Sequence, residues 1–161
     1  MCGGWRDNAL DFLEALDGRI RILERVGEWA EAVRISGELL AADGLVAPSY
    51  VEHMIQTCQE LGPYIAIAPG VAIPHARPED GAKGLGLSLV VVREGVWFGS
   101  HNDPVRVLIA FATPDRSAHI DLLRQLANLL ARAGDLTQAA ARLGTPEEWK
   151  EYLRSILQDS P

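Results

Sequence analysis

The apolar positions of this chain recur at two different spacings along its length. Six stretches carry apolar residues three and four positions apart, which places them on one face of a helix. The expected helices cover residues 8–16, 29–40, 48–61, 117–132, 135–143 and 146–156. In the fourth of these we expect the buried face to consist of Ile120, Leu123, Leu126, Ala127 and Leu130.

Shorter apolar runs predict strands. The expected strands cover residues 19–26, 64–68, 85–93 and 105–111. The third is apolar at nearly every position, which is typical of a central strand buried on both faces. We expect Glu94-Gly95 to turn the chain so that residues 96–98 pair back on this strand. The pattern therefore predicts an α/β protein with helices on both faces of a mixed sheet of four to five strands.

Composition narrows the class of protein. The chain has 161 residues and a net charge of −7, which fits a single domain over residues 1–161, with residues 1–7 expected to be frayed. No cluster of Lys and Arg is present, which argues against nucleic acid and an anionic membrane as partners. The longest apolar run is strand-sized and no signal peptide is recognisable, so we expect a cytoplasmic protein. The two cysteines, Cys2 and Cys58, predict neither a disulfide framework nor a thiolate metal site.

The first candidate for chemistry is His75. It lies in the segment Pro69-Gly70-Val71-Ala72-Ile73-Pro74-His75-Ala76-Arg77-Pro78, where three prolines exclude a helix and stiffen the loop. Its small neighbours would let another protein approach the imidazole ring closely. A neutral imidazole is a nucleophile near pH 7 and needs no separate base.

The second candidate is His119, in the first turn of the helix expected over residues 117–132. The unpaired N–H groups and the dipole at a helix start favour an anion such as phosphate. The other two histidines, His53 and His101, are expected to be solvated on a helix face and in a surface turn. A metal site made by His75, His119 and Asp121 is a rival possibility, but no paired-ligand spacing supports it and no metal or cofactor is expected.

The segment from Gly62 to Gly81 resembles the active-site region of enzyme IIA components of the bacterial phosphotransferase system. The likeness is to the mannitol/fructose (type 2) superfamily and is closest to the ascorbate type. Two later segments, Asn102-Asp103-Pro104-Val105 and Ser117-Ala118-His119-Ile120-Asp121-Leu122-Leu123, resemble further landmarks of that family in the right order and spacing. The resemblance extends from about Leu10 to Leu157.

The resemblance implies a three-layer α/β/α sandwich and a phosphotransferase reaction. By analogy, the phosphocarrier protein HPr phosphorylates His75, and the phosphoryl group passes to a IIB component while the membrane IIC permease imports the sugar. His119 matches the second family histidine, which implies that it stabilises the transferred group. Such a transfer needs in-line positioning and charge stabilisation, and it requires no cofactor.

The sequence departs from the family pattern in one respect. Mannitol-type members carry a basic residue in the helix before the active loop, whereas Gln56-Thr57-Cys58-Gln59-Glu60 offers none here. Arg77 or Arg116 would have to supply that charge. Two alternative functions stay open: a regulatory IIA-like module that binds proteins according to its phosphorylation state, and an unrelated metal-dependent hydrolase. The transported sugar, ascorbate-type by resemblance alone, and the oligomeric state are not encoded in a recognisable pattern.

Overall fold

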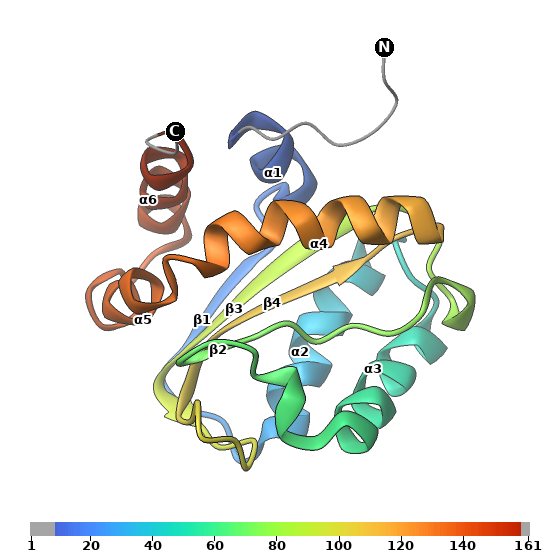
Figure 1. Ribbon diagram of the computed structural model, residues 1–161, viewed down its shortest axis with the longest axis horizontal. Helices are drawn as coiled ribbons and strands as arrows, with labels where there is room; N and C mark the ends of the chain where they lie inside the picture. The colour runs from blue at the N-terminus through green and yellow to red at the C-terminus, as the bar shows by residue number, and fades with distance from the viewer. Residues whose placement is uncertain (1–8, 159–161) are drawn as a thin grey trace.

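The computed structural model describes residues 9–158 of the chain, which Figure 1 colours from blue to red in sequence order. The expectation for residues 1–7 lies outside the described residues. The described part forms the helices α1 (Ala9–Leu16), α2 (Trp29–Ala42), α3 (Pro48–Leu61), α4 (Arg116–Leu130), α5 (Ala133–Arg142) and α6 (Pro146–Gln158). Its strands are β1 (Ile20–Leu23), β2 (Val71–Ala72), β3 (Gly86–Val96) and β4 (Val105–Ala112). Two short 3-10 helices, η1 (Gly62–Ile65) and η2 (Pro78–Asp80), lie on either side of β2.

The four strands form one mixed sheet in the order β1-β3-β4-β2. The two outer pairs, β1 with β3 and β2 with β4, are parallel, and the central pair β3 with β4 is antiparallel. The predicted mixed sheet is therefore confirmed. Because β2 and β4 are parallel, the segments that follow them leave the sheet at the same edge.

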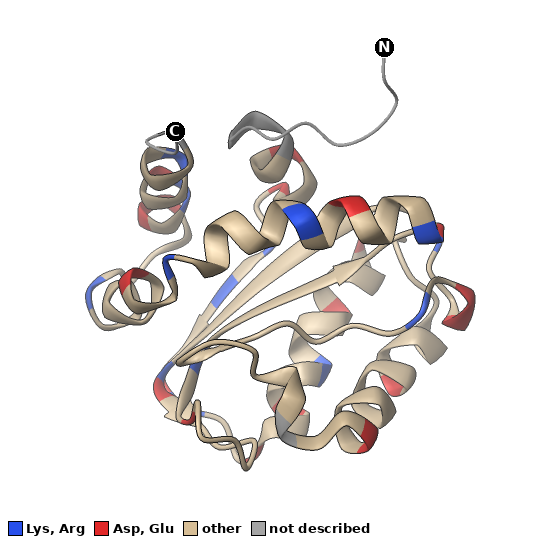
Figure 2. Cartoon of the chain, in the orientation of Figure 1, with Lys and Arg blue, Asp and Glu red and all other residues tan. Residues whose placement is uncertain are grey.

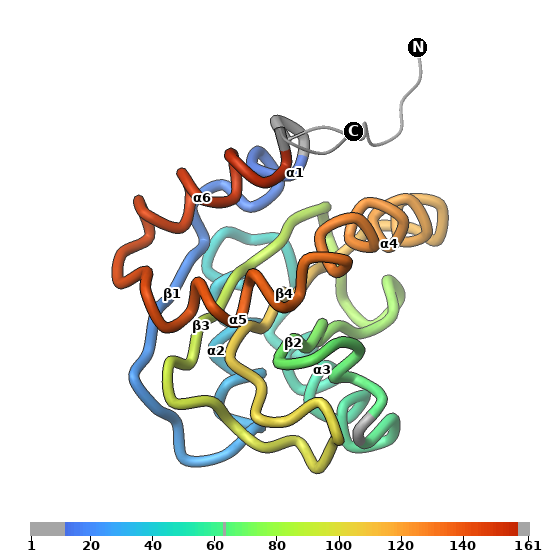
Figure 3. The backbone as a smooth tube through the Cα atoms, turned by 60° about the vertical axis from the view of Figure 1, so that its left-hand side comes forward, coloured from blue at the N-terminus to red at the C-terminus, as the bar shows by residue number. Residues whose placement is uncertain are grey.

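Helices cover both faces of the sheet, as Figures 1 and 3 show. Helices α2 and α3 lie on one face, and α1, α4, α5 and α6 lie on the other. The strand β3 shows why both faces are filled, since Leu87, Leu89 and Val91 belong to one apolar cluster and Val90 and Val92 to the other. Alternation of side chains along a strand turns an uninterrupted apolar run into two buried faces. The strands carry few charges, whereas both signs are scattered over the helices (Figure 2).

The expected turn at Glu94-Gly95 is wrong. The strand β3 continues through both residues to Val96, which pairs with Val105 of β4, and residues 97–98 do not pair back on β3. The register shifts between Val91 and Val96, so the extra residues form a bulge. Gly95 has a φ of 87°, a backbone conformation that glycine adopts without strain and that bulges use.

The expected strand over residues 64–68 is also wrong. The 3-10 helix η1 covers residues 62–65, and Ala68 forms an isolated bridge with Val71. The strand that joins the sheet is β2, inside the proline-rich segment expected to be a loop. Gly62, with a φ of 62°, ends α3 and redirects the chain. Ile65 then accepts a hydrogen bond from Ile73 N–H without forming a ladder. The β1 strand is shorter than expected, at Ile20–Leu23.

Helix α4 forms as predicted, but its predicted buried face is only partly correct, because Leu126 is buried and the other predicted positions are exposed or half-buried. Leu122, Leu126 and Leu129 face the sheet and are fully buried, whereas Ile120 and Leu123 are exposed. Both sets recur at helical spacing, so periodicity alone does not decide which of them is buried. The structure leaves Ile120 and Leu123 on the surface, in the turns that follow His119.

Candidate active site

The loop that carries His75 is fixed to the sheet on both sides. Its predecessor β2 pairs in parallel with β4, with Ala72 opposite Leu108, and the carbonyl oxygen of Pro74 accepts a hydrogen bond from Phe111 N–H. Pro74 and Ala76 are buried, and His75 between them is half-buried. The loop expected from its prolines is thus held against the end of β4.

The ring of His75 is oriented by its own loop and by β4. Its Nδ1 atom lies 2.7 Å from the carbonyl oxygen of Ile73. A carbonyl oxygen only accepts, so Nδ1 carries the proton and Nε2 keeps its lone pair. The ring also stacks on Phe111, with 4.6 Å between centroids and 15° between planes. Backbone and aromatic contacts therefore select one tautomer and one ring plane.

His119 lies beside His75 although 44 positions separate them in the sequence, which is the arrangement that the family resemblance implied. Asp115 caps α4 by accepting a hydrogen bond from Ala118 N–H at 2.8 Å, which places His119 in the first turn. The two imidazole centroids are 5.4 Å apart, and the His119 ring is 5.3 Å from that of Phe111. The three rings form one cluster where the loop, β4 and α4 meet.

Thr113 forms a second polar contact in this cluster. Its hydroxyl oxygen lies 3.3 Å from Nδ1 of His119, and the threonine is buried. If this hydroxyl donates, His119 carries its proton on Nε2, the opposite tautomer to that of His75. One ring then presents a lone pair and its neighbour presents an N–H.

Burial keeps both imidazoles neutral near pH 7. Desolvation lowers the pKa of His75 below its usual value, and the nearby His119 lowers it further, while the hydrogen bond to Ile73 partly opposes the shift. Desolvation also lowers the pKa of His119. The neutral form is the one that can act as a nucleophile.

The two histidines open into a pocket of about 460 Å³. Its walls come from the active loop, the start of α4 and one residue of α3, and they consist of Thr57, His75, Ala76, Arg77, Pro78, Glu79, Pro114, Asp115, Arg116 and His119. Both candidate cations, Arg77 and Arg116, lie in this wall. The guanidinium of Arg77 is exposed and forms ion pairs with Asp80 at 3.5 Å and Glu79 at 3.9 Å. From α3, Thr57 lines the pocket, and it belongs to residues 56–60, a segment that offers no basic residue.

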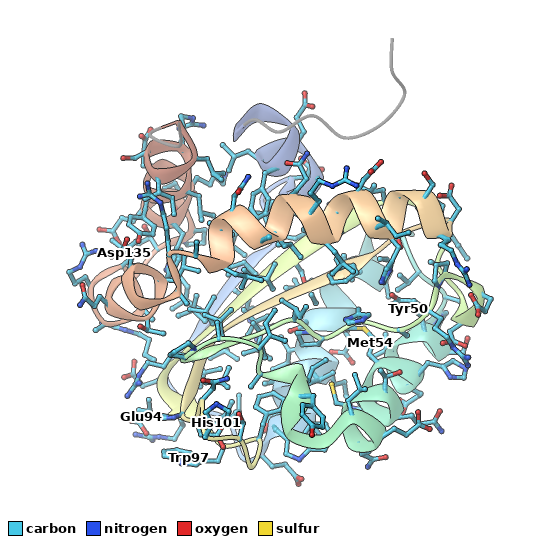
Figure 4. All side chains as sticks on the ribbon, viewed as in Figure 1. Tyr50, Met54, Glu94, Trp97, His101 and Asp135 are labelled. Carbon is cyan, nitrogen blue, oxygen red and sulfur yellow. The ribbon has the colours of Figure 1, made fainter. Side chains whose placement is uncertain are left out.

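The remaining candidates lie elsewhere or have structural partners. His101 is exposed in the turn between β3 and β4, where Figure 4 labels it beside Trp97. His53 is half-exposed on α3, with Nδ1 3.9 Å from a carboxylate oxygen of Asp80. Burial raises the pKa of the Cys58 thiol to about 12. Among residues 9–158, no group of three or more His, Cys, Asp or Glu side chains is arranged to hold a metal ion.

The Asn102-Asp103-Pro104 landmark builds the fold rather than the pocket. The amide of Asn102 donates to the carbonyl oxygen of Ala66 at 2.7 Å, and its own carbonyl oxygen accepts from Gly70 N–H. The carboxylate of Asp103 accepts three backbone N–H groups, from Phe98, Gly99 and Ser100. These bonds tie the β3–β4 turn to the segment that leads into the active loop.

Sequence reasoning did not single out Phe111, Thr113 and Tyr50 as parts of the site. Phe111 and Thr113 belong to the end of an apolar strand and the residue after it, which resembles any other buried strand end. Their one signal is position, since they lie just before the helix that carries His119. Tyr50 lies on the buried face of α3, where its sequence position resembles that of any other core residue.

Comparison with known proteins identifies the family. A family model described as "Phosphoenolpyruvate-dependent sugar phosphotransferase system, EIIA 2" matches residues 16–156. The ascorbate-specific PTS system EIIA component of Escherichia coli (strain K12) is 40% identical over 112 residues, which are 68% of this chain and 73% of the relative. The solution structure of the mannitol-specific cryptic phosphotransferase enzyme IIA from Escherichia coli has a TM-score of 0.79 and 28% identity, and the match covers 92% of this chain and 99% of that one.

A further solved structure is the complex of the mannitol enzyme IIA with phosphorylated enzyme IIB from Escherichia coli. Its match has a TM-score of 0.72 and 27% identity and covers 86% of this chain and 95% of that one. Within the described residues, no helix combines the length and apolarity needed to cross a membrane. The relatives named here do not favour the regulatory alternative, and they confirm the three-layer fold. The chain belongs to the EIIA 2 family of the phosphoenolpyruvate-dependent sugar phosphotransferase system.

Proposed function

We propose that this phosphocarrier receives its phosphoryl group on Nε2 of His75. The observation that carries the proposal is the hydrogen bond between Nδ1 of His75 and the carbonyl oxygen of Ile73, which leaves Nε2 as the nitrogen with a lone pair. His75 lines the pocket, so a donor that docks there meets this nitrogen. The lowered pKa keeps the lone pair free at neutral pH.

The transfer balances without a metal or an added base. The Nε2 lone pair attacks the phosphorus atom of the donor phosphohistidine, and the N–P bond of the donor breaks with its electron pair returning to the donor ring. His75 retains its Nδ1 proton and therefore becomes positively charged. The Ile73 carbonyl oxygen, 2.7 Å away, stabilises that charge. Transfer of the phosphoryl group from His75 to the acceptor reverses these steps.

His119 is proposed to stabilise the phosphoryl group in the transition state of the transfer. With Thr113 donating to its Nδ1 atom, its Nε2–H donates a hydrogen bond to a phosphoryl oxygen next to His75. The start of α4 adds a positive dipole on the same side of the pocket. These preorganised donors stabilise negative charge in the transition state more than water does.

Arg77 is proposed to steer the phosphoryl group, with Arg116 as the second cation in the pocket wall. Arg77 is 75% exposed and forms surface ion pairs with Asp80 and Glu79, so its guanidinium can turn toward an incoming phosphate at little cost. Such a cation takes the place of the basic residue that α3 lacks.

The proposed donor is the phosphocarrier protein HPr and the proposed acceptor a IIB component, which feeds a membrane IIC permease. The solved complex of a mannitol IIA with phosphorylated IIB, at 27% identity, supports the IIB partner. Such partners work in the cytoplasm, the location we propose for this chain. Likeness to an ascorbate-specific component supports an ascorbate-type sugar as the transported substrate.

The test is phosphorylation by phosphoenolpyruvate, enzyme I and HPr, followed by transfer to IIB. Wild-type protein should acquire one acid-labile, base-stable phosphoryl group, and His75→Ala should acquire none. His101→Ala is the matched control, because it removes an exposed histidine far from the pocket and should label normally. Full labelling of His75→Ala would refute the assignment.

A further inference from the structure

Tyr50 lies beneath the active loop, on the buried face of α3, where Figure 4 labels it. Its side chain is 1% exposed, and its hydroxyl forms polar contacts with two segments of the site. The hydroxyl accepts a hydrogen bond from Ala76 N–H at 3.1 Å. It lies at the same distance from the carbonyl oxygens of Ala76 and Phe111, and its single proton is donated to one of them at a time.

These contacts join the two walls that orient the nucleophile. Ala76 directly follows His75 in the active loop, and Phe111 is the ring on which His75 stacks. The hydroxyl of Tyr50 is thus one residue away from the nucleophile along the chain and one ring contact away through β4. A shift of either wall would move Nε2 relative to His119.

We infer that Tyr50 is a positioning residue for the proposed transfer, because its hydroxyl fixes the His75 loop to the end of β4. The inference rests on the proposed function of His75. The pKa of Tyr50 is raised to about 12, chiefly by burial, so the hydroxyl keeps its proton over the working pH range. The hydroxyl is therefore available both to donate and to accept a hydrogen bond. Tyr50 does not touch the transferred group.

The test is Tyr50→Phe, which removes the hydroxyl and keeps the ring. Tyr152→Phe is the matched control, since the hydroxyl of Tyr152 on α6 is buried without a hydrogen-bond partner within residues 9–158. We expect Tyr50→Phe to accept phosphate from phospho-HPr about tenfold more slowly, with an unchanged KM, because in-line transfer is sensitive to small displacements. Nitrogen NMR should show His75 losing its single tautomer. Tyr152→Phe should match the wild type in both measurements.

A merely structural role would lower the melting temperature of Tyr50→Phe while leaving the His75 tautomer and the transfer rate unchanged, and that result would overturn the inference. If Tyr50→Phe does not fold, amide hydrogen exchange of the wild-type protein tests the positioning role of Tyr50 instead. The Ala76 N–H must then exchange slowly, and exchange as fast as that of an exposed loop amide would overturn the inference. The NMR and exchange measurements need no phosphoryl donor. A wild-type protein that accepts no phosphate would therefore refute the proposed function, whereas the hydrogen bond from Ala76 N–H to the Tyr50 hydroxyl could still be measured.

Discussion

At the scale of single residues, the site depends on two imidazoles whose Nδ1 atoms have different hydrogen-bond partners. His75 donates from Nδ1 to Ile73, and His119 has its Nδ1 beside the hydroxyl of Thr113. The sequence predicted both histidines, because one lies between prolines and the other in the first turn of a helix. It did not predict their tautomers, because these depend on a backbone carbonyl and a hydroxyl whose positions only the folded chain fixes.

The lowered pKa of His75 predicts a pH dependence of stability. The unfolded chain binds a proton on this ring near pH 6.5, whereas the buried ring binds it only at lower pH. The unfolded state thus gains the proton first, so stability is full above about pH 6.5 and falls as the pH drops through the window down to the lowered pKa. Chemical denaturation at several pH values should show a shallower fall for His75→Gln than for wild type. An equally steep fall in His75→Gln would contradict this origin, and His101→Gln is the control.

At the scale of elements, the sequence predicted where helices begin and which segments are amphipathic. It did not predict the pairings between distant segments. Helix α4 begins one residue before its expected start and α6 begins at the expected residue. Asp115 caps the first of these helices, and a Thr145–Glu148 capping box caps the second. The two-residue strand β2 was missed because its pairing of Val71 with Val107 is long-range and leaves no local period. The buried face of α4 was partly misassigned for the same reason, since the sheet decides which apolar positions of the helix it covers.

The cap of α4 gives a prediction at this scale. Asp115→Ala should lower the free energy of unfolding by about 1 kcal/mol and fray the turn that holds His119. Transfer should slow in parallel, measured as single-turnover phosphorylation by phospho-HPr. Thr145→Ala is the control, because it removes the cap of α6 at a similar cost of about 1 kcal/mol while leaving the site intact. Equal transfer rates in the two variants would contradict a role for the α4 start.

At the scale of the whole molecule, the sheet brings together segments that are far apart in sequence. Parallel pairing of β2 with β4 makes the His75 loop and the segment leading to α4 emerge at one edge of the sheet (Figure 1), and residues of both segments line the pocket. The sequence predicted the mixed sheet and the two helical layers, but it contained no measure of the 5.4 Å that separates the rings. That separation follows from strand order, which local patterns do not specify.

The exposed stripe of α4 predicts where a partner docks. Ile120 is 51% exposed in the turn that carries His119, so a docked partner would bury it beside the pocket. Ile120→Ser should raise KM for phospho-HPr about tenfold with little change in stability, as is typical of a central interface residue. Trp97→Ala is the control, because Trp97 is also exposed and apolar but lies on the β3–β4 turn (Figure 4). A rise in KM for Trp97→Ala alone would place the partner elsewhere.

The assignment of the phosphoryl group to Nε2 of His75 is tested most directly by identifying the nitrogen that carries phosphate. Protein labelled with ¹⁵N in histidine, phosphorylated through HPr and observed by ³¹P and ¹⁵N NMR, distinguishes the two ring nitrogens of each histidine. The hydrogen bond from Nδ1 to Ile73 predicts a single phosphorus–nitrogen bond at Nε2 of His75, with Nδ1 still protonated. Phosphate on Nδ1 of His75, or on any other histidine, would contradict this assignment.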